Sequence, residues 1–190
     1  MRKIAILIVI ALVGCGGTPV QEPEYYLLRS EATSTGNGSG DVPTTTLGNV
    51  RVASYIDRSG IVLETSSGTL RPARQHLWAE PLREGLRTFL ADEISSFLGR
   101  PVRPANYGDT DWRQYTTEVV DIQIQELHGT ASGDATLSAR WAVIDPKASS
   151  VISEHEFSGR TALTADGYPA LVAAEKQLLS QLADAIARSL

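Results

Sequence analysis

The chain has 190 residues but only one cysteine, three histidines and one long run of apolar residues. A single cysteine has no partner for an intramolecular disulfide, so the core alone must hold the fold together. The histidines, His76, His128 and His155, lie far apart in the sequence and match no metal-ligand spacing, so a metal site has little support. The G-x-S-x-G elbow, the phosphate-binding loop and the G-x-G-x-x-G fingerprint are also missing.

The residues that could act as acids or bases have simpler structural interpretations. Glu80 precedes Pro81, which suits the start of a helix, so its carboxylate would place negative charge at a helix N-terminus. Asp57 and Arg58 are expected to pair on a sheet or across a subunit contact. Serines are plentiful enough that residue counts alone leave a Ser-His-Asp triad open, but no elbow motif supports one. We therefore predict a protein that is not an enzyme and that uses no cofactor or metal.

The one long apolar run lies at the N-terminus and is predicted to belong to a lipoprotein signal peptide, residues 1–14. Arg2-Lys3 forms its charged region, and the ten apolar residues that follow would make a helix of about 15 Å, half of a bilayer core of about 30 Å. The run ends in Leu12-Val13-Gly14-Cys15, the pattern of a bacterial lipoprotein box. Cys15 is therefore expected to be lipidated and to become the mature N-terminus. An ordinary secretory signal followed by a chance cysteine is the alternative.

The residue after the cysteine and the net charge bear on where the mature protein would lie. In enterobacterial-type sorting, Asp at that position retains a lipoprotein in the inner membrane. Here the position holds Gly16, which predicts the outer membrane, with the protein facing the periplasm. Loss of the signal leaves 15 basic and 22 acidic residues, a net charge of −7 that argues against nucleic acid and anionic lipid as partners. Residues 15–24 are predicted to be a lipidated tether, so acyl chains would provide the attachment to the membrane.

Two elements in the first half are predicted from local patterns. Residues 56–72 favour a β-hairpin, with an apolar run before a Ser66-Ser67-Gly68 turn. Residues 81–98 favour an amphipathic helix that ends at Gly99. Its apolar positions follow the spacing of one helical stripe, namely Leu82, Leu86, Phe89, Leu90, Ile94, Phe97 and Leu98.

Further strands, a second helix and two long loops complete the prediction. Alternating residues indicate strands near 25–28, 50–56, 102–105, 120–125, 135–143 and 151–157, and a closing helix is expected from about 169 to 189. Residues 30–46 are of low complexity and favour a flexible loop, either a partner-binding loop or an inert insertion. Residues 107–115 form a second loop, in which Trp112 would either fold back on the core or contact a partner.

The order of these elements predicts an α+β fold. One antiparallel sheet has a single apolar face to offer, and two long amphipathic helices must each bury a stripe, so both are expected on that face in a two-layer domain. The mature chain is long enough for one sizeable core. We therefore predict a single domain over residues 25–190.

Two short motifs resemble those of a known family. Tyr55, Asp57-Arg58 and Ile61-Val62 are similar to its first element, although Ser59-Gly60 stands where the family usually has Pro-Gln. Trp78-Ala79-Glu80-Pro81-Leu82, with Gly85 one turn on, resembles its second and more specific element. The family is that of the PqiC/YmbA-type lipoproteins, auxiliary subunits of an ABC-type lipid transport system.

The resemblance implies a docking role at the outer membrane. Such a lipoprotein would work with an inner-membrane ABC permease through a periplasmic MCE-domain protein, support membrane integrity, and form a homo-oligomer around that assembly. Trp112, Arg113 and Tyr115 are our candidates for the contact with the partner, because interfaces favour aromatic and arginine anchors. The alternative is a periplasmic lipoprotein unconnected with transport, acting in cell-envelope assembly or binding peptidoglycan or a small apolar ligand.

Overall fold

The structure, a computed structural model, describes residues 22–31, 45–66, 68–105 and 116–190. Eight strands of these residues form one curled sheet in the order β1-β4-β3-β6-β2-β5, and β7 and β8 continue it on the free side of β6. The strands are β1 (Glu24–Tyr26), β2 (Thr45–Val52), β3 (Gly60–Ser66), β4 (Thr69–Trp78), β5 (Arg103–Pro104), β6 (Glu118–Gly129), β7 (Asp134–Asp145) and β8 (Ser150–Ala162), and the described helices are α1 (Leu82–Leu98) and α3 (Tyr168–Ala187).

The predicted α+β class is confirmed, but the prediction of an antiparallel sheet is wrong, because the sheet is mixed. Strands β3–β4, β6–β7 and β7–β8 pair antiparallel. Strands β2–β6, β3–β6, β1–β4 and β2–β5 pair parallel. The hairpin β3–β4 and helix α1 lie between β2 and β6 in the chain. Such a long crossover returns the chain to the same end of the sheet, so the strand after it runs parallel to the strand before it.

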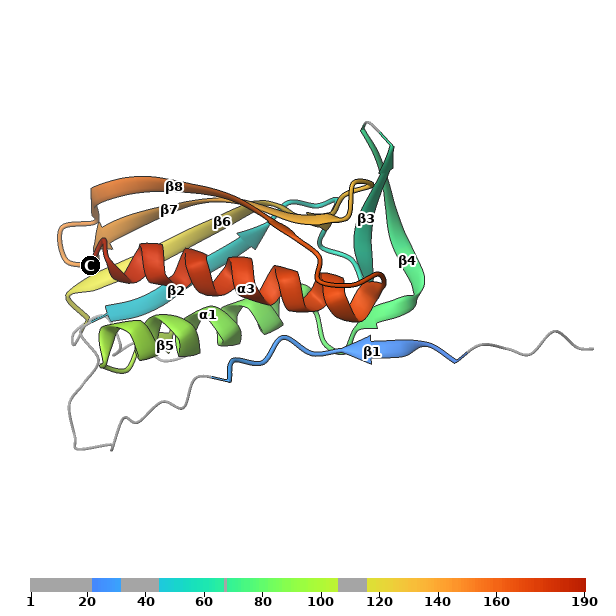
Figure 1. Cartoon of the computed structure of the whole chain (residues 1–190). Helices are drawn as coiled ribbons and strands as arrows, with labels where there is room; N and C mark the ends of the chain where they lie inside the picture. The colour runs from blue at the N-terminus through green and yellow to red at the C-terminus, as the bar shows by residue number, and fades with distance from the viewer. Residues whose placement is uncertain (1–21, 32–44, 67, 106–115) are drawn as a thin grey trace, which may run out of the picture.

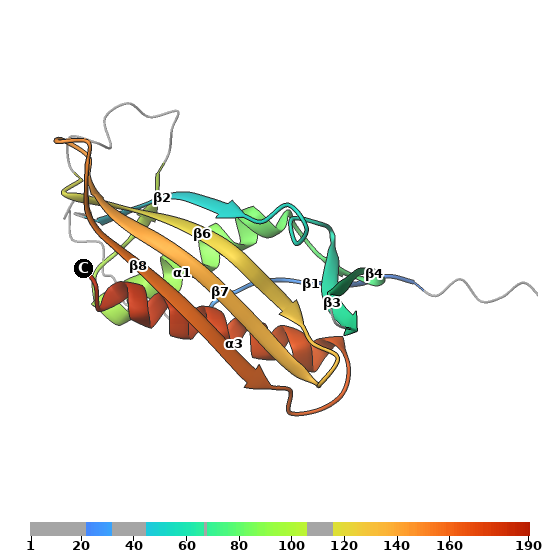
Figure 2. The same ribbon diagram turned by 90° about the horizontal axis from the view of Figure 1, so that it is seen from above.

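The helices and the sheet form layers over most of the molecule. Figure 1 shows β6, β7 and β8 above α3 and β2 above α1, with the hairpin β3–β4 standing at one end of the layers and β1 beneath it. From above, Figure 2 shows β6, β7 and β8 running side by side across α3. The simple two-layer picture predicted from the sequence therefore omits the hairpin end, where the strands turn away from the layers.

The residues on the helix side of the sheet explain this packing. Leu137, Ala139, Trp141 and Val143 alternate along β7 and are all buried, whereas their neighbours are more exposed. Two glycines let helix α3 approach the strands closely: a Cβ atom built on Gly129 would lie 2.9 Å from Leu171, and one built on Gly159 would lie 2.9 Å from Leu178. A larger residue at either position would push the helix away from the sheet.

Helix α1 has nearly the predicted bounds, and the residues at its two ends explain why. Pro81 occupies the position before the first helical residue, and Gly99 ends the helix with a left-handed φ of 64°, which glycine adopts without strain. Leu82, Leu86 and Ile94 are buried as the stripe predicts. The last turn differs, because Phe97 is 48% exposed. The predicted apolar stripe is therefore longer, by its last turn, than the part of the helix that packs in the core.

Three local boundaries also differ from the prediction. Strand β4 extends to Trp78, through residues expected to link the hairpin to the helix, because β1 pairs with its last three residues. Strand β6 extends to Gly129, beyond the strand predicted near 120–125, and so includes His128. Thr45 and Thr46, the last two residues of the predicted flexible loop, belong to β2 and are buried.

Candidate functional site

The two family motifs meet at the junction of the hairpin with helix α1. The backbone N–H of Trp78 donates to the carbonyl of Ser59 at 2.7 Å, and the N–H of Ala79 donates to the carbonyl of Tyr26 at 2.7 Å. Across the same junction, Arg83 of α1 pairs with Asp57 at 2.6 Å. The motifs thus connect β1, β3, β4 and α1, and Asp57 pairs with the helix and not with the neighbouring Arg58.

Tyr55 secures the other side of this junction. Its hydroxyl donates to the carbonyl of Gln125 at 3.0 Å, on strand β6. Its ring meets His128 edge-on, with 6.2 Å between ring centroids. Burial, with a smaller contribution from the carboxylate of Glu126, raises the pKa of Tyr55 to about 12. The phenol therefore stays protonated and keeps donating to β6 over the whole physiological range.

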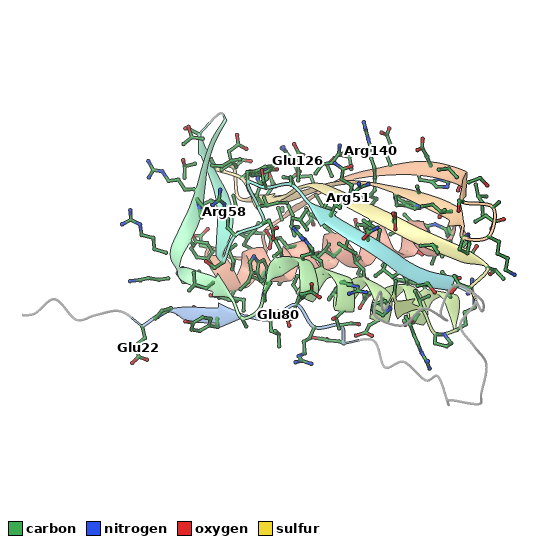
Figure 3. All side chains as sticks on the ribbon, turned by 180° about the vertical axis from the view of Figure 1, so that it is seen from behind. Glu22, Arg51, Arg58, Glu80, Glu126 and Arg140 are labelled. Atoms are coloured by element: carbon green, nitrogen blue, oxygen red, sulfur yellow. The ribbon has the colours of Figure 1, made fainter. Side chains whose placement is uncertain are left out.

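The remaining motif residues have equally local roles. A Cβ atom on buried Gly85 would lie 3.3 Å from the Glu80 carboxylate and 3.5 Å from Leu28, so glycine suits the close approach of that chain segment. Helix α1 receives no side-chain hydrogen bond at its N-cap, so Glu80 is near the helix N-terminus without capping it. Figure 3 shows Arg58 beside the hairpin strands and Glu80 below them, near the start of α1. The residues of the two motifs therefore hold a structural junction together, and they do not form an arrangement of catalytic side chains.

Strand β1 is fixed to the same end of the molecule by a cluster of polar aromatic contacts. The hydroxyl of Tyr26 donates to Glu24 at 2.6 Å and lies 3.2 Å from Nδ1 of His76. The His76 ring stacks on Tyr168, at the start of α3, with 4.0 Å between centroids. Burial and the neighbouring Glu24 raise the pKa of Tyr26 to about 12. The segment nearest the predicted tether is therefore attached to both β4 and α3.

The opposite end of the molecule holds a second polar cluster, which sequence reasoning missed. Thr45 at the start of β2 donates to Glu118 at the start of β6, and Arg100, just after α1, contacts both residues, with 3.1 Å between Arg100 Nη2 and Glu118. Beside them, the hydroxyls of Thr46 and Thr116 lie 2.8 Å apart. We call these five residues the loop-base cluster, because Thr45 and Thr116 are the first residues that the structure describes after residues 32–44 and 106–115, which fall in the two predicted loops.

Three of the five exposed large apolar side chains of the described residues lie at the same end, and the other two, Tyr25 and Leu70, lie at the hairpin end. Phe97 in the last turn of α1 is 48% exposed, and Val151 and Ile152 at the start of β8 are 55% and 60% exposed. The register of β8 against β7 shifts beside Ile152, which leaves two consecutive apolar residues on the surface. Two exposed apolar neighbours are unusual on a strand that otherwise alternates, so this end has the character of a contact surface.

The outer face of the sheet is polar and open. It has a shallow trough of about 610 Å³ whose lining includes Arg51, Arg140, Glu154 and Glu156. Figure 3 shows Arg51 and Arg140 above the strands, away from the helices. In residues 22–31, 45–66, 68–105 and 116–190, no group of three or more His, Cys, Asp or Glu residues is placed to hold a metal ion.

Some predicted site residues lie outside the described residues, namely Cys15, Gly16, Trp112, Arg113 and Tyr115. Within the part that the structure describes, no helix is both long and apolar enough to cross a membrane. In the described residues, the family motifs and strand β1 form one end of the molecule. The loop-base cluster lies at the other end.

Solved structures share this arrangement. A crystal structure of an uncharacterized protein matches with a TM-score of 0.70 and 24% identity, over 89% of this chain and 99% of the other. A crystal structure of a protein from Xanthomonas campestris matches with a TM-score of 0.61 and 16% identity, over 87% and 91% of the two chains. At these identities the likeness establishes the fold: a curled mixed sheet with two helices.

The sequence establishes the family. The model of the ABC-type transport auxiliary lipoprotein component family matches residues 25–187, so the chain belongs to that family. The intermembrane transport lipoprotein PqiC of Escherichia coli strain K12 is 24% identical over 180 residues, which cover 94% of this chain and 91% of PqiC, and PqiC of Shigella flexneri matches equally. The resemblance predicted from the motifs is confirmed. The protein is a non-enzymatic auxiliary component of ABC-type transport, and this favours the transport interpretation over the unconnected lipoprotein.

Proposed function

We propose that this protein is anchored in the outer membrane by a lipid on Cys15 and docks a periplasmic MCE-domain protein, which connects it to an inner-membrane ABC permease. Together these components would move lipid between the two membranes and support membrane integrity. The observation that carries the proposal is the separation of strand β1 from the loop-base cluster, at opposite ends of the layers (Figure 1). Family membership supports the auxiliary transport role.

The end with β1 suits the membrane side. If Cys15 is the mature N-terminus and Gly16 directs the protein outward, seven residue steps separate the lipid from Glu22, the first described residue. At no more than about 3.6 Å per residue, that tether reaches at most roughly 25 Å. Strand β1, held by Tyr26 and His76, would therefore stay close to the membrane surface.

The loop-base end suits the partner side. Helix α1 has 17 residues, so at about 1.5 Å per residue it separates the two ends by about 25 Å. The described flanks of both predicted loops lie at this far end: Ser30 donates to Glu93 on α1, and the N–H of Ala105 donates to the Leu47 carbonyl at 2.7 Å. Ala105 and Thr116, the described residues on either side of the predicted loop with Trp112, Arg113 and Tyr115, lie at this end. Aromatic and arginine side chains are the usual anchors of protein interfaces.

We further propose that several copies assemble around one MCE protein, with the domain of residues 25–190 as the subunit. Strand β8 supports this proposal, because in the described part of the chain it pairs with β7 alone and offers 13 residues of free edge. An open edge of this length is a template for pairing with another chain.

Co-purification with the MCE-domain protein of the same genome tests the proposal. Replacing Trp112 and Tyr115 together by alanine should weaken recovery of the partner without unfolding the domain, because those side chains are the proposed anchors. Tyr25→Ala is the matched control, since Tyr25 is an exposed aromatic residue at the β1 end. Circular dichroism checks the fold: if the double variant unfolds, the loop is structural. If the wild-type protein recovers no MCE partner, the docking function is wrong.

A further inference from the structure

An open pocket of about 380 Å³ lies on the outer side of the sheet, where the hairpin β3–β4 rises beside β6 and β8. Its lining includes Tyr55, Glu64, Leu70, Glu126, His128 and Arg160. The geometry points to a binding site for a primary alkylammonium group, as found in a small amine or in an ethanolamine headgroup. This site is separate from the loop-base cluster and does not depend on the proposed docking.

His128 supplies a hydrogen-bond acceptor. Its side chain lines the pocket but is only 7% exposed. Its Nδ1 lies 3.0 Å from the carbonyl of Gly129, and because a carbonyl only accepts, Nδ1 must hold the ring proton. In the neutral ring, Nε2 is then left as an acceptor, and within the described residues it has no hydrogen-bond partner. Although the side chain is mostly buried, Nε2 is not among the buried atoms that lack a partner. It is therefore accessible, and a ligand N–H in the pocket can donate to it in place of water.

The charges around the pocket call for a cation. Glu64 accepts a hydrogen bond from the Gly68 N–H at 3.0 Å, but neither Glu64 nor Glu126 has an ion pair in the described part of the chain. The charge of Arg160 is opposed by Asp134 at 3.9 Å. Figure 3 shows Glu126 on the outer side of the sheet, open to solvent. Glu64 and Glu126 thus carry negative charges without an ion-pair partner, while the positive charge of Arg160 is offset by Asp134. The net charge around the pocket is therefore negative.

The aromatic ring completes the recognition of an ammonium. Tyr55 gives its own proton to the Gln125 carbonyl, so it offers the ligand a ring and not a competing donor. Cations are attracted to aromatic faces, and a primary ammonium has three N–H donors. Nε2 of His128 and the carboxylates of Glu64 and Glu126 provide three acceptors of the right kind. A quaternary ammonium, which has no N–H, would leave Nε2 without a donor.

The test is an NMR titration of the full lipidated chain in phosphatidylcholine nanodiscs. Ethanolamine should produce saturable shifts at Tyr55 and His128, whereas choline, which has the same charge but no ammonium N–H, should not. Glu126→Gln should weaken ethanolamine binding about tenfold or more, because it removes a charge-assisted hydrogen bond. Glu154→Gln, which removes the same charge from the same face outside this pocket, should leave it unchanged. Replacing His128 by phenylalanine should also abolish the response.

The lipid arm identifies the source of the amine. If nanodiscs containing phosphatidylethanolamine produce the same shifts without added ethanolamine, the ligand is the headgroup. If they do not, while ethanolamine binds, the ligand is a free amine. The proposal is overturned if ethanolamine causes no saturable shift at millimolar concentration, if choline binds as well, or if Glu126→Gln and Glu154→Gln behave alike. Glu126 is exposed, so the Glu126→Gln variant is expected to fold. The test therefore remains valid even if the His128 variant does not fold.

Discussion

Glu175 provides a sharp test of how the core is built. It lies in the middle of the buried face of α3, among Leu171, Leu178 and Leu182, and is only 1% exposed. Its Oε2 has no hydrogen-bond partner within the described residues. Burial raises the pKa of Glu175 from an ordinary 4.5 to about 8, and no neighbouring charge contributes. The folded protein therefore holds this carboxyl in its neutral form near pH 7.

The magnitude follows from proton linkage. The folded-state pKa of this acid is raised, so between pH 4.5 and 8 the unfolded chain has released the proton that the folded chain keeps. Stability must then fall as the pH rises through this window. At about 1.4 kcal/mol per pH unit, Glu175 should cost roughly 3 kcal/mol between pH 4.5 and 7 and roughly 4 kcal/mol by pH 8, where the folded carboxyl is itself half titrated.

Chemical denaturation at a series of pH values measures this effect. Glu175→Gln removes the titrating group and keeps the shape, so the wild type should lose stability relative to the variant by the amounts above. Glu154→Gln is the control: it neutralises an exposed carboxylate of the outer face, and its stability should follow the wild-type curve. If the free energies of unfolding of wild type and Glu175→Gln change in parallel from pH 4.5 to 8, the carboxyl is not buried as described and the reasoning fails.

Three further predictions concern the core and the anchor. Leu86→Ala should cost roughly 2–5 kcal/mol in chemical denaturation, because Leu86 is fully buried under the sheet, and a loss below about 1 kcal/mol would contradict that packing. Cys15→Ser should release a folded protein from the membrane on fractionation, because acyl chains are the proposed attachment, and retention after a salt wash would argue against it. Gly16→Asp should move the protein to inner-membrane fractions on a density gradient, and a wild type already found there would remove the geometry needed for docking.

Local patterns in the sequence predict the helices well. In α1, Leu82, Leu86 and Ile94 follow one stripe and are buried, because helical periodicity depends only on neighbours in the chain. Pro81 and Gly99 set the ends by their own backbone preferences. The exposure of Phe97 could not be predicted, because it depends on how far the sheet extends over the last turn.

Pairing between distant segments explains what the sequence could not show. Thr45 and Thr46 look like part of a polar loop, but they are buried because Glu118 at the start of β6 and Thr116 just before it lie beside them, about 70 positions along the chain. Their β-branched side chains next to Leu47 were the one available signal of a strand. His128 likewise lies beyond the strand predicted near 120–125. The register shift after Ile124 breaks the alternation and puts His128 on the outer face, beside Tyr55.

Site-specific photo-crosslinking in cells tests the central claim most directly, because it reports which end of the protein meets the MCE partner. One probe replaces Phe97, exposed beside the loop-base cluster, and the other replaces Tyr25, which is 64% exposed on β1. The docking account predicts a crosslink to the MCE-domain protein from position 97 and none from position 25. A crosslink from position 25 alone, or from neither position while the partner is present, would contradict it.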